Sequence, residues 1–314
     1  MPATESFEAA LQSGQLPAIR KFPKSDLHNH SILGTRIERI ESWIGTSLPR
    51  PSSLMHSLDE MIRYSHDVLY PHIETKPGFK FTAASAIDEA IEDGVTVLEM
   101  SMDVRFSGLF TEGLDEFFGF VSELGTRYKD RIDFRPEIGM SKDRAAEDQL
   151  RLAHAFIDSG LFRSIDLYGN ELAQPPEPFC KVFQYARSKG LKLKAHAGEF
   201  GGPDVVARVL DALEVDEIQH GVRAAESIEV MSRLQRDRIR LNVCPSSNLA
   251  LGVVTNISQH PIRALFDHGV RVTVNTDDLT IFGQSVSEEY LLLFNSHLFS
   301  AYELDAIRIE GLRS

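Results

Sequence analysis

The chain has 314 residues, of which 42% are hydrophobic and 25% are charged, a composition typical of a globular protein. Its 33 Lys and Arg residues face 46 Asp and Glu residues, which gives a formal net charge of -13. A surface this acidic repels nucleic-acid phosphates and anionic lipids, so the composition disfavours both as partners. It favours a partner that is small and neutral or cationic, or a metal.

The two cysteines, Cys180 and Cys244, lie far apart in the sequence and form no disulfide framework, which fits a reducing compartment. The N-terminal residues 1–22 lack the apolar centre of a signal peptide. No run of apolar residues approaches the length of a membrane span. We therefore expect a cytoplasmic protein, and the sequence carries no signal for its oligomeric state.

The first predicted strand is "SDLHNH", residues 25–30, and the next follows only after residue 94. The intervening segment contains "PSSLMHSLDEMIRYSHDVLY" (51–70), which predicts one or two helices inserted after the first strand. Insertions of this kind commonly lie over an active-site mouth. His66 and His72 are candidate residues of such a lid.

Seven further apolar segments predict strands at 95–102, 133–140, 164–169, 191–198, 216–221, 239–245 and 270–277. Helical patterns at 86–94, 178–190 and 204–213 alternate with them, and Gly190 and Gly269 are typical of helix C-caps. Eight strands alternating with helices predict a (β/α)8 TIM barrel, with an open doubly wound sheet as the alternative. We expect one domain over residues 1–314.

Polar side chains gather at the ends of these predicted strands. They are His28 and His30 on the first, Gly169 on the fourth, His196 and Glu199 on the fifth, His220 on the sixth, and Asp277 and Asp278 on the eighth. The C-terminal ends of barrel strands surround one pocket, so these residues should lie together.

His28 and His30 are two residues apart, so both imidazoles project from one face of a strand. Alone, such a pair is more often a surface feature of a strand, because His-X-His is a weak motif. Together with His196 and Asp277 it makes an N/O ligand set suited to Zn2+. A zinc ion lowers the pKa of its bound water to about 7, which supplies hydroxide at neutral pH.

Glu199 follows His196 by three residues, where its carboxyl group could transfer protons rather than bind the metal. The alternative is a carboxylate near the N-cap of the next helix. For His220 and Asp278 the catalytic interpretation is hydrogen bonding to the attacking water or to the substrate. The alternatives are a core histidine and an N-cap.

Two-metal hydrolases on this barrel need a bridging ligand at the end of strand four, usually a modified lysine. The fourth predicted strand ends in "DLYGN", without lysine, so we expect one metal ion per chain. The remaining histidines, His260 among them, are assigned structural or surface roles.

The motifs "DLHNH", "DLYGNE", "HAGE", "IQHG", "CPSSN" and "NTDD" resemble, in order and spacing, those of the adenosine deaminase family of the amidohydrolase superfamily. The resemblance covers about residues 20 to 300. It implies zinc ligation by His28, His30, His196 and Asp277, and proton transfer to purine N1 by Glu199. It further implies that His220 orients the hydroxide, that Asp278 contacts N7 and the water, and that the backbone N–H of Gly169 meets N3.

The resemblance implies a hydrolytic purine deaminase, an enzyme that acts on C–N bonds of cyclic amidines, with adenosine as the default substrate. Adenosine deaminases carry "HLDG", whose acid contacts the ribose, and adenine deaminases carry "HLEG". This chain has "HSILG" (30–34), so the usual ribose-binding acid is missing or displaced. Adenine and a modified or phosphorylated adenosine such as N6-methyl-AMP therefore remain alternatives, the last because of Arg36 and Arg39. A non-deaminating amidohydrolase and a catalytically silent binding protein are further alternatives.

Overall fold

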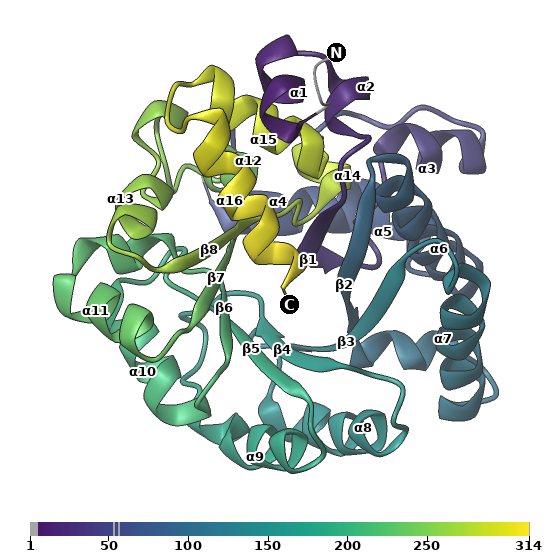
Figure 1. The fold of residues 1–314 in the computed structure, drawn as a ribbon. Helices are drawn as coiled ribbons and strands as arrows, with labels where there is room; N and C mark the ends of the chain where they lie inside the picture. Colours follow the sequence, from purple (N-terminus) through teal and green to yellow (C-terminus); the bar gives the residue numbers. More distant parts are fainter. Residues whose placement is uncertain (1–5, 53, 56, 314) are drawn as a thin grey trace.

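The computed structural model describes residues 6–52, 54–55 and 57–313. Eight strands each pair in parallel with the next strand along the chain, so their spatial order is their sequence order (Figure 1). They are β1 (Lys24–His30), β2 (Val95–Asp103), β3 (Asp133–Ser141), β4 (Ser164–Tyr168), β5 (Lys192–Ala197), β6 (Glu217–His220), β7 (Arg240–Val243) and β8 (Arg271–Val274). This order confirms the predicted (β/α)8 barrel and is not that of a doubly wound sheet.

The barrel closes between β8 and β1 through the residues that follow β8. Asn29 and Asp277 form a parallel bridge, and the Asp277 N–H donates to the His28 carbonyl oxygen at 2.9 Å. The Leu27 N–H donates to the side-chain oxygen of Asn275 at 2.8 Å. Closure of the barrel thus places Asp277 beside the two histidines of β1.

Helices form the outer ring around the strands (Figure 1). They are α6 (Lys76–Glu92), α7 (Leu114–Tyr128), α8 (Ala146–Asp158), α9 (Cys180–Ser188), α10 (Pro203–Leu213), α11 (Ile228–Arg236) and α13 (Ile262–Asp267). Each is amphipathic or largely apolar on the side that faces the sheet; α11, for instance, buries Val230, Met231 and Leu234. The predicted C-cap glycines Gly190 and Gly269 both have φ of 82°.

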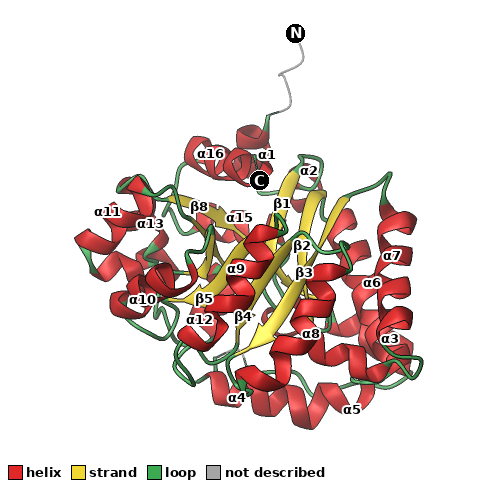
Figure 2. Ribbon diagram, turned by 90° about the horizontal axis from the view of Figure 1, so that it is seen from below, coloured by secondary structure: helices red, strands yellow, loops and turns green. Residues whose placement is uncertain are grey.

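Helices from the two ends of the chain cover the N-terminal opening of the barrel. The helix α16 (Ala301–Leu312) packs on β1 and β8, and α1 (Phe7–Ser13) packs on α16 (Figure 2). A Cβ atom at Gly311 would lie 2.1 Å from the Ser25 hydroxyl, so this approach requires a glycine. Substrate must therefore enter from the opposite end.

The segment after β1 covers that opposite end, as predicted, but with more helices than expected. It contains α3 (Ile37–Ile44), α4 (Leu58–Tyr64), a π-helix (Ser65–Leu69) and α5 (Tyr70–Ile73). Figure 2 shows α4 and α5 on the side of the barrel away from α1 and α16. Single π-helical turns are frequent at functional sites, and this one lies over the mouth of the barrel.

The remaining helices are short or lie at the two ends. They are α2 (Leu16–Ile19), α12 (Pro245–Ala250), α14 (Leu279–Phe282) and α15 (Val286–Asn295), with 3-10 turns at Val104–Leu109, Glu177–Phe179, Val222–Glu226 and Ile257–Gln259. The predicted strand 239–245 stops earlier, at Val243, because Pro245 begins α12. The predicted strand 270–277 ends at Val274, since the next residues make the closing contacts to β1.

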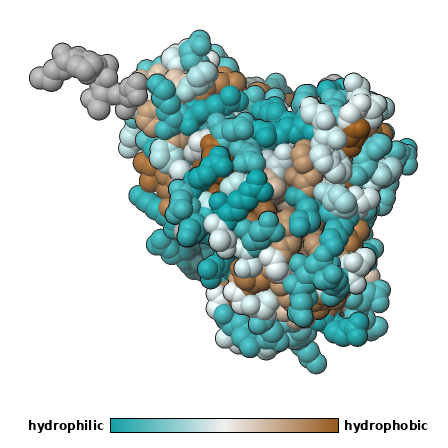
Figure 3. Space-filling model, turned by 90° about the vertical axis from the view of Figure 1, so that its right-hand side faces the viewer, coloured by the Kyte–Doolittle hydropathy of each residue, from teal (hydrophilic) through white to brown (hydrophobic). Residues whose placement is uncertain are grey.

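No helix among the described residues is long and apolar enough to cross a membrane. On the face that Figure 3 shows, hydrophobic side chains lie interspersed with hydrophilic ones.

Candidate active site

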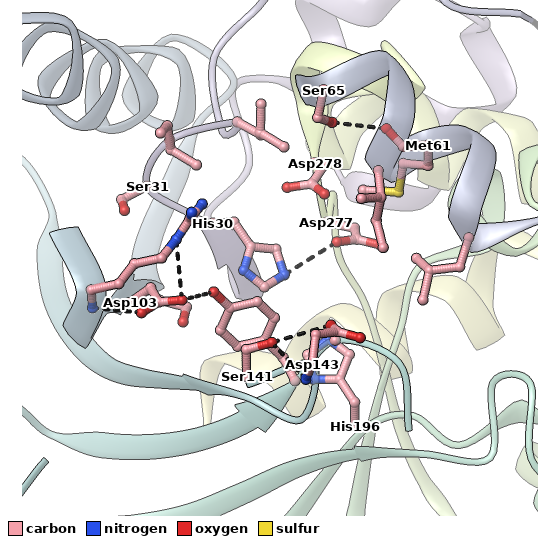
Figure 4. A pocket seen from close by; sticks show the side chains of 18 of the residues that line it. His30, Ser31, Met61, Ser65, Asp103, Ser141, Asp143, His196, Asp277 and Asp278 are labelled. Carbon is pink, nitrogen blue, oxygen red and sulfur yellow. Dashed lines mark hydrogen bonds and ion pairs between the residues drawn. The ribbon is translucent and has the colours of Figure 1, made fainter. Parts of the chain in front are cut away.

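A cavity of about 350 Å³ lies at the C-terminal end of the barrel (Figure 4). Strand ends line its floor, and the insertion after β1 contributes Leu58, Met61, Ile62, Ser65, His66 and Tyr70. His66, predicted as a possible lid residue, lines the cavity, whereas His72 is not among its lining residues. The insertion thus forms the outer wall of the cavity.

Three of the predicted ligand residues converge. One ring nitrogen each of His28, His30 and His196 lies within 4.8 Å of the other two, which is close enough to share one metal ion. The Asp277 Oδ1 atom lies 3.6 Å from His28 Nε2 and 3.4 Å from His30 Nε2. Figure 4 shows His30 and Asp277 facing one another across the cavity.

Hydrogen bonds to the far nitrogens orient two of these rings. His28 Nδ1 lies 3.3 Å from the Asn242 carbonyl oxygen, and His196 Nδ1 lies 3.2 Å from the Asp166 carboxylate. Such partners fix the proton on Nδ1 and leave the Nε2 lone pair for a metal. His28 Nε2 is buried and has no hydrogen-bond partner, as expected of an atom that serves as a ligand.

The electrostatics of the site fit a cation. Burial lowers the pKa of His28 well below its usual value, so this ring is a neutral donor. Although burial opposes it, Asp278 and Asp277 raise the pKa of His30 to about 10. Burial, together with the charge of Asp277, raises the pKa of Asp278 to about 7. The two acids thus favour a positive charge where the imidazoles converge, and a divalent ion would supply it.

Two site residues have left-handed backbone conformations, which L-residues rarely adopt. Asp277 has φ of 59° and His220 has φ of 61°. Strain of this kind is typical of functional sites, where the surrounding fold enforces it. The Ser247 hydroxyl donates to Asp277 Oδ2 at 2.7 Å and so holds the carboxylate in place.

Glu199 lies inside the cavity rather than at a helix start, since the N-cap of α10 is Gly202. Its Oε2 atom lies 3.6 Å from His220 Nε2. Burial, with help from Asp277 and Glu171, raises the pKa of Glu199 well above its usual value. The loop is held by Glu171, whose carboxylate accepts the N–H of Gly198 at 2.6 Å and that of Gly201 at 2.5 Å.

His220 and Asp278 also face the cavity. His220 Nε2 points toward Glu199 and lies 3.8 Å from Asp277 Oδ2. Asp278 occupies the N-cap position of α14, but its side chain makes no capping hydrogen bond and its Oδ1 atom is buried without a partner. A core histidine and an N-cap, the structural alternatives for His220 and Asp278, therefore do not account for the position of both side chains at the cavity.

Gly169, directly after β4, lines the cavity with φ of 86°. A Cβ atom there would lie 2.2 Å from Asp143 Oδ2 and 2.8 Å from the Ser141 hydroxyl. Only glycine fits, and its backbone is exposed to whatever the cavity binds.

The site has no lysine at the end of β4, which finishes at Tyr168. The nearby Lys142 instead donates to the Glu171 carbonyl oxygen at 3.0 Å and is not among the residues that line the cavity.

Several residues that support the site were not singled out from the sequence: Asp166, Glu171, Ser247, Asn248 and His260. Four of them lie inside the motifs "DLYGNE" and "CPSSN", which were available as a signal. His260 lies in no such motif. It was assigned a structural or surface role, and it is buried against Asn248.

Comparison with known proteins agrees with this geometry. The sequence profile described as "Adenosine deaminase" matches residues 134–314. A provisionally named adenosine/adenine deaminase of Treponema pallidum is 35% identical over 288 residues, which cover 92% of this chain and 96% of that protein. An adenine deaminase of Stutzerimonas stutzeri is 44% identical over 227 residues, 72% of this chain and 62% of that protein.

Among solved structures, the adenine deaminase of Arthrobacter aurescens superposes with a TM-score of 0.82 at 25% identity and covers 93% of both chains. The chain belongs to the adenosine deaminase family, whose enzymes are hydrolases that act on C–N bonds of cyclic amidines.

Proposed function

We propose that the protein deaminates a 6-aminopurine by hydrolysis, with one zinc ion held by His28, His30, His196 and Asp277. The observation that carries the proposal is the convergence of three imidazoles within 4.8 Å, beside a buried glutamate whose pKa is raised by burial. The overall reaction exchanges the C6 amino group for oxygen and releases ammonia.

The chain's own residues have separate tasks in this proposal. Burial raises the pKa of Glu199, which favours its protonated form, and in this role it donates the proton to N1 of the purine. His220 and Asp278 orient the attacking water, and Asp278, whose pKa is raised to about 7, in its protonated form donates to N7 of the ring. The Gly169 N–H donates to N3. When bound, zinc would lower the pKa of its water to about 7, so that attack occurs at neutral pH.

We rank adenine above adenosine, the default expectation, as the substrate. Where the family pattern has a ribose-binding acid, this chain has Ile32 and Leu33, and both are buried and line the cavity. An apolar wall offers no partner for ribose hydroxyl groups, which would lose their hydrogen bonds to water on binding. The nearby acid Asp103 is already engaged, since it accepts from Arg144 NH2 at 2.6 Å and from the Tyr168 hydroxyl.

A phosphorylated substrate has weaker support. Arg36, which motivated it, pairs with Glu288 at 2.6 Å, and Arg39 pairs with Glu89 at 2.7 Å; neither lines the cavity. Two arginines among the described residues line the cavity: Arg105 pairs with Glu74 at 2.8 Å, and Arg144 pairs with Asp103 at 2.6 Å. These guanidinium groups are neutralised within the protein and offer little net attraction to phosphate.

A substrate panel tests the proposal. Zinc-loaded enzyme is incubated with adenine, adenosine, AMP and N6-methyl-AMP, and ammonia release is measured. We expect turnover of 6-aminopurines with the highest kcat/KM for adenine. Absence of turnover with all four compounds would contradict the proposed function, and a preference for adenosine would contradict the ranking.

A further inference from the structure

His260 and Asn248 are both buried, and neither is among the residues that line the cavity. His260 precedes α13, and its Nδ1 atom accepts the N–H of Ile262 at 3.1 Å. That N–H belongs to the first turn of the helix and has no partner within it, so the ring serves as the acceptor. Nδ1 of His260 is therefore unprotonated.

Burial lowers the pKa of His260 to about 3, so the ring is neutral and carries its one proton on Nε2. This Nε2 atom lies 3.3 Å from Asn248 Oδ1. A nitrogen that bears a proton needs an acceptor, which only the oxygen of the amide supplies. His260 therefore determines which way round the Asn248 amide lies.

With its oxygen turned to His260, the Asn248 amide turns its NH2 group to the catalytic residues. Nδ2 lies 3.3 Å from His220 Nδ1 and 3.4 Å from Glu199 Oε1. The reversed amide would place its oxygen beside Glu199 and its NH2 group against the Nε2 proton of His260. The second of these contacts would be repulsive, because two N–H groups would face each other, so the observed orientation is favoured.

An amide N–H that donates to Nδ1 requires this nitrogen of His220 to be unprotonated. The His220 proton then lies on Nε2, which faces Glu199 Oε2 at 3.6 Å and Asp277 Oδ2 at 3.8 Å. His220 consequently presents an N–H donor, rather than a lone pair, to the cavity.

We propose that His260 and Asn248 are positioning residues, which together fix His220 as the Nε2–H tautomer and orient Glu199. His260 touches neither substrate nor metal and acts only through Asn248. The kinetic part of this inference rests on the proposed deaminase function, whereas the tautomer of His220 can be measured without turnover.

The test compares two replacements of His260. Gln can accept from the Ile262 N–H and donate to Asn248, as His260 does, whereas Leu can do neither. Replacing His268 with Leu is a control for a histidine at the other end of α13, because His268 contacts Ser232 and no site residue. Each variant is measured for bound zinc, kcat, KM and the ¹⁵N chemical shifts of the His220 ring, which the His220→Gln spectrum assigns.

We expect His260→Leu to lower kcat by about 10- to 100-fold, as is typical for outer-shell partners, with KM and bound zinc nearly unchanged. His260→Gln should restore most of kcat, and His268→Leu should match the wild type. The wild-type spectrum should show an unprotonated Nδ1 on His220, and His260→Leu should shift that signal.

A wild-type His220 with its proton on Nδ1 would overturn the inference, whatever the activity. So would an equal loss of kcat in the Gln and Leu variants of His260, which would indicate packing alone. A wild type without deaminase activity but with the expected His220 spectrum would contradict the proposed function and leave the positioning role supported.

Discussion

The interior of the barrel holds two buried polar groups, and they differ in how their charges are balanced. Toward the N-terminal end lies a lower charge group, made of Glu99, Glu137, Lys194, Glu217 and Arg240. Toward the C-terminal end lies the metal-ligand group, made of His28, His30, His196 and Asp277. The two are adjacent on β5, where Lys194 belongs to the first and His196 to the second.

The lower charge group pairs its charges within the protein. Lys194 Nζ lies 2.5 Å from Glu99 and 2.7 Å from Glu137, and Arg240 lies 2.5 Å from Glu217. The metal-ligand group pairs Asp277 with imidazoles, leaves His28 Nε2 without a hydrogen bond and lies beside a second buried acid, Asp278. Charges of the lower charge group are thus paired within the fold, whereas the metal-ligand group offers a donor set that an added cation would complete.

The largest expected effect comes from breaking the metal-ligand group. His196→Ala removes one of three imidazoles, so zinc should dissociate and adenine turnover should fall below detection. Zinc content by atomic absorption and ammonia release measure the two effects. His154→Ala, at an exposed histidine of α8, should leave both unchanged. Wild-type turnover by the zinc-free His196→Ala protein would contradict the ligand assignment.

The next effect separates chemistry from metal binding. Glu199→Gln keeps the shape of the side chain but removes the acid, so kcat should fall by about 10²- to 10⁴-fold while zinc remains bound. The free energy of unfolding at neutral pH should not decrease, because no ion pair is broken. Unchanged kcat would exclude Glu199 from the reaction.

Breaking the lower charge group should affect stability instead. Lys194→Met leaves Glu99 and Glu137 without their shared cation, so the free energy of unfolding should fall by about 3–5 kcal/mol. Lys192→Met is the matched control: this side chain is 29% exposed, and its removal should cost about 0–1 kcal/mol. Denaturant titration measures both. Equal values for the two variants would contradict the distinction between buried and half-buried pairs.

The smallest expected effect concerns a buried acid that lies in neither group. Glu289 accepts the Ser246 N–H at 3.1 Å, and burial raises its pKa to about 8. In the unfolded chain a Glu has a pKa of about 4.3, so the folded state binds the proton more tightly and stability falls as the pH rises between these two values. Glu289→Gln removes this titration.

The variant should therefore gain stability relative to the wild type between about pH 5 and about pH 8. Denaturant unfolding at the two pH values checks this. If the free energies of unfolding of the variant and the wild type differ by the same amount at both pH values, Glu289 does not titrate in this range.

The sequence predicts most of this architecture because strand ends and ligand positions coincide. Each of the eight predicted strands overlaps the observed one, and their boundaries differ where Pro245 begins a helix and where Asn275 to Asp277 close the barrel. His28, His30, His196 and Asp277 could be grouped because a parallel barrel brings strand ends together.

The supporting contacts could not be predicted in the same way. His260 reaches Asn248 across a loop of irregular structure, and no periodicity encodes that approach. The hydrogen bonds that orient His28 and His196 come from a carbonyl group of β7 and a carboxylate inside β4. Such contacts depend on strand register and loop path, which local sequence does not specify.

We propose that one zinc ion completes the metal-ligand group and supports purine deamination. A zinc titration of chelator-treated enzyme, followed by adenine-dependent ammonia release, tests it most directly. The account predicts no activity in the metal-free protein and a linear recovery that ends at one zinc per chain. Full activity without metal, or recovery that needs two ions per chain, would contradict it.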